Sequence, residues 1–192
     1  MNTIFASYPS LPRYWSLALS RDNSANANGG IIAIGGTPAF DDPKVNVSSP
    51  TYSSAPLQID PNVPGTISFY SIFVDGFVLG SNSGDSGTQV IIDSGSPRLD
   101  IPADLADAVN ALWYPAIASD GRTLDCNAVL TQSFAVVIGG VPYYISYVDL
   151  IASNGDGSCS SLVVGASSGY SLGDPFLRNV LAIYDWGASQ MA

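Results

Sequence analysis

The chain has 192 residues, of which 46% are hydrophobic and 11% are charged, and it carries a net charge of −10. This composition excludes a disordered chain and is typical of β-rich secreted proteins. The negative charge and the lack of a membrane-length apolar run argue against nucleic-acid and membrane partners. Because the sequence has no histidine, Ser-His-Asp and Cys-His catalysis are excluded, and we expect neither a metal site nor a cofactor.

The N-terminal third predicts a hairpin followed by a long loop. The first nine residues have no basic segment and no long apolar core, so they do not read as a signal peptide, and we expect a mature fragment with a start Met or a cytosolic protein. Residues 14–22 alternate apolar and polar side chains, and residues 31–34 form a second apolar run, which together indicate a β-hairpin. Residues 37–66 are rich in proline, serine and aspartate, and Asn46 begins a weak N-glycosylation sequon there.

The middle of the chain contains two Asp-Ser-Gly tripeptides in different settings. Residues 67–79 predict two strands joined by a turn at Asp75-Gly76. The first tripeptide, Asp85-Ser86-Gly87, lies in a glycine-rich loop with no strand before it, and we interpret it as a turn. The second, Asp93-Ser94-Gly95, follows the apolar run Val90-Ile91-Ile92. A strand gives a carboxylate the rigid support that water activation needs, and glycine lets backbone N–H groups reach its oxygens. The tripeptide alone is equally consistent with a second turn.

The second half of the chain predicts one helix, several strands and a disulfide. The composition of residues 103–113 favours a helix, because alanine and leucine are good helix formers. Further elements are expected at residues 134–138 and 141–145 (a hairpin), 148–152 (a helical turn) and 161–165 (a strand). Cys126 and Cys159 both lie among polar turn residues, whereas buried free cysteines usually lie in apolar runs. The pair therefore predicts a surface disulfide and an oxidising compartment.

The stretch from Gly169 to Trp186 is the most specific in the chain, with Leu-Gly-Asp followed by Phe-Leu-Arg. Together with the stretch from Tyr70 to Gly80 and the Asp93 segment, it resembles the C-terminal lobe of pepsin-like aspartic peptidases over residues 14–186. The resemblance implies that residues 1–192 form a single all-β domain, one lobe of the acid-protease fold with a few short helices. It also implies that Gly173 lets the chain cross closely behind the Asp93 loop, and that Asp174 caps a short helix. The two cysteines fall where that lobe commonly has a disulfide.

The resemblance implies roles for four residues in peptide hydrolysis at acid pH. Asp93 matches the catalytic acid, Ser94 the residue that reaches across to the partner lobe, Gly95 the glycine whose N–H binds the carboxylate, and Ser96 the hydroxyl beside its outer oxygen. The family uses one aspartate from each of two lobes, the ionised one to activate water and the protonated one to donate to the scissile carbonyl. Since the sequence holds only one Asp-Ser-Gly that follows an apolar strand, we expect the chain to be inactive without an N-terminal lobe.

Two departures from the family pattern keep alternatives open. Pro97 stands where Thr or Ser is usual and removes a hydroxyl and an N–H, and Ser171 replaces a bulky aliphatic residue, which predicts weaker packing. Arg98 and Asp100 are expected to lie on a solvated strand face.

The alternatives are a catalytically dead pepsin-like binding or inhibitor module, and an isolated lobe that self-associates. Besides a polypeptide substrate, the expected partner is thus an N-terminal lobe or a second copy, and the parent protein is expected to be secreted or vacuolar.

Overall fold

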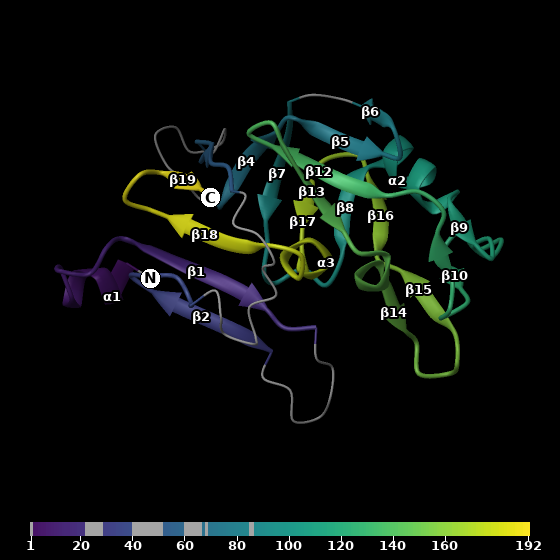
Figure 1. Ribbon diagram of the computed structural model, residues 1–192, viewed down its shortest axis with the longest axis horizontal. Helices are drawn as coiled ribbons and strands as arrows, with labels where there is room; N and C mark the ends of the chain where they lie inside the picture. Colours follow the sequence, from purple (N-terminus) through teal and green to yellow (C-terminus); the bar gives the residue numbers. More distant parts are fainter. Residues whose placement is uncertain (1, 22–28, 40–51, 60–66, 68, 85–86) are drawn as a thin grey trace.

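The computed structural model describes residues 2–21, 29–39, 52–59, 67, 69–84 and 87–192 (Figure 1). These residues form mainly short β-strands with few helices, in agreement with the predicted all-β class. Within these ranges, no helix is long and apolar enough to cross a membrane. The predicted glycosylation residue Asn46 lies outside the described residues.

One five-stranded sheet brings the two ends of the chain together. Its strands, in spatial order, are β2 (Gly30–Ile34), β1 (Tyr14–Leu19), β18 (Leu181–Asp185), β19 (Gln190–Met191) and β3 (Ala55–Pro56). The predicted hairpin is confirmed, because β1 and β2 pair antiparallel from Trp15 opposite Ile34 to Leu19 opposite Gly30. The other edge of β1 pairs with β18, so the purple and yellow ends of the chain lie side by side in Figure 1. A short helix that was not predicted, α1 (Asn2–Ser7), precedes this sheet.

The second five-stranded sheet carries the Asp93 segment. Its strands, in spatial order, are β16 (Val163–Ala166), β8 (Leu99–Pro102), β17 (Ser171–Leu172), β7 (Thr88–Ile92) and β4 (Ser71–Val74). β17 lies between β7 and β8, with Leu172 parallel to Ile92 on one side and antiparallel to Leu99 on the other. A strand from near the end of the chain thus separates two strands that are neighbours in sequence.

A four-stranded sheet confirms one predicted hairpin and corrects two other expectations. Its strands, in spatial order, are β13 (Val141–Ile145), β12 (Phe134–Ile138), β5 (Gly76–Leu79) and β6 (Asn82–Gly84). The β12–β13 hairpin is as predicted. The turn predicted at Asp75 is wrong, because β4 and β5 pair in different sheets and the chain passes between them there. The expectation that no strand precedes Asp85 is also wrong, since β6 lies before it and pairs with β5. The turn between the two strands is at Gly80, whose φ of 63° suits glycine.

The remaining strands and helices are short. Small sheets are formed by β10 (Thr123–Leu124), β15 (Cys159–Ser161) and β14 (Ile151–Ser153), and by β9 (Trp113–Tyr114) and β11 (Val129–Leu130). The helices are α2 (Ala103–Asn110), α3 (Asp174–Leu177) and the 3₁₀ helix η1 (Tyr147–Leu150). The helix predicted over 103–113 stops at Asn110, because the chain turns so that Trp113 enters β9 and its Nε1 donates to Asn110 Oδ1 at 3.3 Å. The strand predicted at 161–165 begins at Val163, and the helical turn predicted at 148–152 gives way to β14 at Ile151.

The predicted disulfide between Cys126 and Cys159 is present, with an S–S distance of 2.02 Å. Cys126 is exposed, but Cys159 is buried at 3% exposure, so the bridge anchors a surface turn to the core rather than lying wholly on the surface. The bond spans 33 residues and ties the loop before β11 to β15.

The hydrophobic core includes buried residues of the five-stranded sheet that carries the Asp93 segment. Val90, Leu99, Ile101 and Leu172 have no exposed surface, and Ile92 is 4% exposed. Apolar residues alternate along β8, where Leu99 and Ile101 are buried and the residues that follow each are only partly covered. This alternation is what a sheet with one face against the core requires. The segment that precedes Asp93 is therefore anchored in the buried core.

Candidate active site

Asp93 lies at the end of β7 in a turn held by backbone hydrogen bonds. Its N–H donates to the Leu172 carbonyl at 3.0 Å, and its own carbonyl accepts from the Ser96 N–H at 3.2 Å. The Gly95 N–H donates to Asp93 Oδ1 at 2.9 Å. A Cβ at Gly95 would lie 3.2 Å from that same oxygen, so glycine allows the backbone to approach the carboxylate. The Asp93 side chain is half-buried, and the backbone of its own loop orients its carboxylate.

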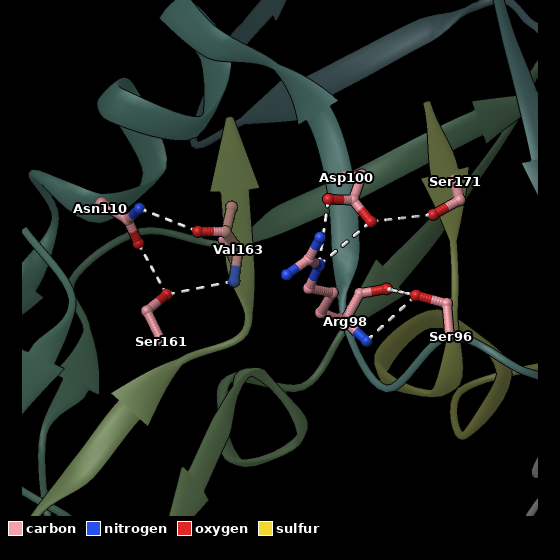
Figure 2. Close-up of polar contacts among 7 residues, drawn as sticks. All are labelled: Ser96, Arg98, Asp100, Asn110, Ser161, Val163 and Ser171. Carbon is pink, nitrogen blue, oxygen red and sulfur yellow. Dashed lines mark hydrogen bonds and ion pairs between the residues drawn. The ribbon is translucent and has the colours of Figure 1, made fainter. Parts of the chain in front are cut away.

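The two serines of this loop have different surroundings. Ser94 is exposed to solvent. Ser96 Oγ donates to the Arg98 carbonyl at 3.1 Å and accepts from the Arg98 N–H at 3.4 Å, as Figure 2 shows. The hydroxyl of Ser96 therefore closes the turn that leads into β8, and the roles expected for Ser94 and Ser96 around Asp93 stay predictions.

Behind the loop, the chain crosses at Gly173 in very close contact. A Cβ at Gly173 would lie 2.2 Å from the Ser96 carbonyl oxygen and 2.5 Å from that of Arg98. The φ of Gly173 is −94°, so glycine is required here for space and not for conformation. The next residue, Asp174, donates its N–H to the Ser96 carbonyl at 2.8 Å. The crossing at Gly173 that the resemblance implied is therefore present and fixes the back of the Asp93 loop.

The predicted cap of α3 is wrong. The N-cap position is Gly173, which has no side chain to cap the helix, and Asp174 is the first helical residue. Its backbone carbonyl, not its carboxylate, accepts the hydrogen bond from the Arg178 N–H at 2.9 Å. The Asp174 side chain is instead left beside the Asp93 loop.

Arg98, Asp100 and Ser171 form a polar cluster that joins β8 to β17 (Figure 2). Arg98 Nε lies 3.1 Å from Asp100 Oδ1, and Ser171 Oγ donates to Asp100 Oδ2 at 3.2 Å. The Arg98 side chain is 45% exposed, as expected, but the Asp100 side chain is only 18% exposed, so the expected solvated strand face is wrong for Asp100. Ser171, at 7% exposure, is also not simply a packing defect, because its hydroxyl bonds across the strand pair to the residue opposite it. The serine at this position and the acid opposite it in β8 are thus complementary.

A second polar group supports the neighbouring strand and was not found from the sequence. Asn110 Nδ2 donates to the Val163 carbonyl at 3.1 Å, and Asn110 Oδ1 accepts from Ser161 Oγ at 2.7 Å. Ser161 Oγ in turn accepts from the Val163 N–H at 3.2 Å, closing the ring of contacts seen in Figure 2. These bonds attach the end of α2 to the start of β16. No sequence pattern links Asn110 to the other two residues, because it lies more than fifty positions from them in the chain.

A cavity of about 300 Å³ lies behind the loop, lined in part by Pro97, Asp149, Asp174 and Arg178. Asp149 is 3% exposed and accepts from Arg21 Nε at 2.9 Å, so its buried charge is paired. Burial raises the pKa of Asp174, Arg178 opposes this shift, and the nearby Asp93 carboxylate adds to it.

In the part of the chain that the structure describes, no group of three or more Cys, Asp or Glu side chains could hold a metal ion.

An aromatic cluster that sequence reasoning missed lies against the Asp93 strand. The Tyr70 ring meets Trp15, Tyr184 and Trp186 edge-on, with centroid distances of 6.0, 4.7 and 6.3 Å. The Tyr70 carbonyl accepts from the N–H of Ile92, the residue before Asp93, at 2.8 Å. The cluster therefore joins the sheet at the chain ends to the sheet that carries the candidate carboxylate.

Comparison with known proteins agrees with this geometry. Residues 13–192 match the family described as eukaryotic aspartyl protease. A probable aspartic-type endopeptidase of Aspergillus fumigatus is 33% identical over 195 residues, which cover 92% of this chain and 43% of that protein. An acid protease of Saccharomycopsis fibuligera is 27% identical, covering 88% of this chain and 44% of its own length, and mouse gastricsin is 30% identical, covering 64% and 34%. The chain thus spans less than half the length of these relatives. It belongs to the pepsin-like aspartyl protease family.

Proposed function

We propose that this chain is the C-terminal lobe, a single domain over residues 1–192, of an aspartic endopeptidase, and that Asp93 is its catalytic carboxylate. The observation that carries the proposal is the anchored carboxylate itself. Asp93 follows a buried strand, its Oδ1 accepts from the Gly95 N–H at 2.9 Å, and the chain crosses behind it at Gly173. The order of the motifs along the chain, with the stretch from Tyr70 to Gly80 directly before the Asp93 strand, supports the assignment to the C-terminal lobe.

In this function Asp93 supplies half of the acid–base chemistry. The ionised carboxylate of a pair takes a proton from the attacking water, and a protonated partner donates to the scissile carbonyl. One carboxyl group cannot be in both states at once, so Asp93 requires a second carboxylate from a companion N-terminal lobe. The exposed Ser94 and the hydroxyl of Ser96 are the proposed supporting groups, the first facing that lobe. We therefore infer that the chain on its own has negligible peptidase activity.

The substrates proposed for the assembled enzyme are polypeptides, which are cleaved at acid pH because the pair must keep one proton. The proposed location of the parent protein is the secretory pathway, either secreted or vacuolar. The Cys126–Cys159 bridge supports this location, since such bonds persist in oxidising compartments.

The experiment is a digestion of a denatured protein at acid pH by the chain alone and by the chain mixed with the N-terminal lobe of a close relative. Cleavage that requires both lobes, is blocked by a pepsin-type transition-state inhibitor and is lost in Asp93→Asn would support the proposal. The matched control is Asp104→Asn, which removes an exposed carboxylate of α2 and should leave cleavage unchanged. Inhibitor-sensitive cleavage by the chain alone would show instead that a second copy supplies the partner carboxylate.

Two observations favour the alternatives. Pro97, exposed and without an N–H, lies two residues after Gly95, which favours a catalytically dead binding or inhibitor module. The edge strand β2 exposes 60% of Ile32, which favours self-association. Tight peptide binding without cleavage in the two-lobe assay would support the first alternative. A dimer of the chain alone in light scattering would support the second.

A further inference from the structure

The guanidinium of Arg98 is held at one nitrogen and open at the other two. Arg98 Nε lies 3.1 Å from Asp100 Oδ1 and donates to Asp100 Oδ2 at 3.2 Å. The Nη1 and Nη2 atoms donate no hydrogen bond within the described residues, and 45% of the side chain is exposed. An arginine bound only through Nε keeps N–H donors whose planar geometry matches a carboxylate. The exposed end of Arg98 can therefore bind an anion.

The groups that support this arginine are mostly buried. The Asp100 side chain is 18% exposed, and Ser171, at 7% exposure, donates from Oγ to Asp100 Oδ2 at 3.2 Å (Figure 2). The backbone of Arg98 is held as well, because Ser96 Oγ donates to its carbonyl at 3.1 Å and accepts from its N–H at 3.4 Å. These contacts restrict the guanidinium before any ligand binds, which lowers the entropy cost of binding.

Asp93 and Arg98 lie on the same face of the sheet. Side chains alternate between the two faces of a strand. Asp93 directly follows the buried Ile92 of β7, and its N–H still bonds to the neighbouring strand at Leu172. Arg98 directly precedes the buried Leu99 of β8. Both charged side chains therefore point away from the core. Only β17 lies between β7 and β8, so the two strands are separated by two strand spacings, about 10 Å.

We propose that Arg98 is a specificity-determining residue that binds an acidic side chain of the polypeptide substrate, with Asp100 as its positioning residue. The inference rests on the proposed function, because it takes Asp93 as the place of cleavage, and it adds the class of substrate. An extended peptide advances about 3.3 Å per residue, so a peptide whose scissile bond lies at Asp93 reaches Arg98 with a residue about three positions away.

Charge complementarity selects the occupant of this face. The open N–H donors of Arg98 require an anion, and the carboxylates of Asp and Glu are the anionic side chains of a polypeptide. A lysine or arginine of the substrate would meet the outer positive charge of Arg98 first, because Asp100 lies beneath it and is already paired. The cluster therefore favours cleavage near acidic residues.

The test compares peptides that differ only in a Glu, Gln or Lys at this distance from the scissile bond, placed on either side in turn. The chain is assembled with an N-terminal lobe and assayed at about pH 5.5, where a peptide Glu is ionised. We expect kcat/KM to be about five- to tenfold higher for the Glu peptide than for the Gln peptide on the preferred side. This ratio should be lost in Arg98→Gln and partly kept in Arg98→Lys, which retains the charge but not the planar group.

Two further variants separate the roles of the residues. Asp100→Asn should lower the Glu to Gln ratio, because the guanidinium is held less firmly, whereas a merely structural Asp100 would lower cleavage of both peptides equally. The matched control is Arg122→Gln, which removes an exposed arginine just before β10 and should leave the ratio unchanged.

A second measurement needs no cleavage. The same peptides, carrying a fluorescent label, are titrated with the chain alone and followed by fluorescence anisotropy. Tighter binding of the Glu peptide that is lost in Arg98→Gln would support the site even if neither peptide is cleaved, so failure of this inference and failure of the proposed function are distinguishable. Equal cleavage and equal binding of the Glu and Gln peptides would overturn the inference. A preference for the Lys peptide would also overturn it, since Asp100 would then be the group that contacts the substrate.

Discussion

The crossing behind the Asp93 loop depends on the lack of a side chain at residue 173, and Gly173→Ala tests this directly. The new Cβ would lie 2.2 Å from the Ser96 carbonyl oxygen and 2.5 Å from the Arg98 carbonyl oxygen, whereas real Cβ atoms essentially never come within 3.0 Å of another heavy atom. Both obstructing atoms belong to the backbone, so no change of side-chain rotamer relieves the clash. The crossing strand and the loop must separate by most of an ångström.

The cost follows from the contacts that this separation breaks. The Asp174 N–H bond to the Ser96 carbonyl, at 2.8 Å, and the Asp93 N–H bond to the Leu172 carbonyl, at 3.0 Å, both span the crossing. Each such bond contributes about 1 kcal/mol, and overpacking of a rigid site costs about 1–3 kcal/mol more. We therefore expect Gly173→Ala to lower the free energy of unfolding by roughly 3–5 kcal/mol.

Urea unfolding followed by tryptophan fluorescence measures this loss. The matched control is Gly84→Ala on β6, where an added Cβ meets nothing within 4 Å. The control should change the free energy of unfolding by less than about 1 kcal/mol. If Gly173→Ala unfolds at the same urea concentration as Gly84→Ala, the tight crossing is not what holds the Asp93 loop, and the structural basis of the proposed site fails with it.

Three further predictions concern stability. Replacing Cys126 and Cys159 with serine should lower the free energy of unfolding by about 3–4 kcal/mol on the loop-entropy model for a 33-residue separation, and an unchanged melting temperature would contradict it. Hydrogen bonds from Thr123 lower the pKa of Asp120 to about 2, so its carboxylate stabilises the fold above pH 4 and this stabilisation is lost as the pH falls toward 2. Asp120→Ala should therefore lower the melting temperature at pH 6 but not at pH 2, and an equal effect at both would refute the assignment. Burial raises the pKa of Asp174, so the wild type loses stability as the pH rises through that raised value, and Asp174→Asn should raise the melting temperature at pH 7 more than at pH 3; an equal or reversed difference would contradict the shift.

The sequence by itself determined the local elements and the identity of the candidate carboxylate. The hairpins β1–β2 and β12–β13 were predictable because each joins two mainly apolar strands that are close in the chain and separated by turn residues. Asp93 stood out from Asp85 through the apolar run before it, and the glycine of the crossing was found through the family pattern. The same local information misjudged the turn at Asp75, because two adjacent strands read as a hairpin whether or not they share a sheet.

Only the tertiary structure decided which distant segments meet. β17 enters between β7 and β8, and this insertion alone makes Ser171 a partner of Asp100 and turns two apparently unrelated residues into one cluster. Tyr184 stacks on Trp15 because β18 pairs with β1 from the opposite end of the chain. The physical reason is that a strand's periodicity states which side chains face the core but not which strand lies beside it. That choice is made by the burial and hydrogen bonding of the whole sheet at once.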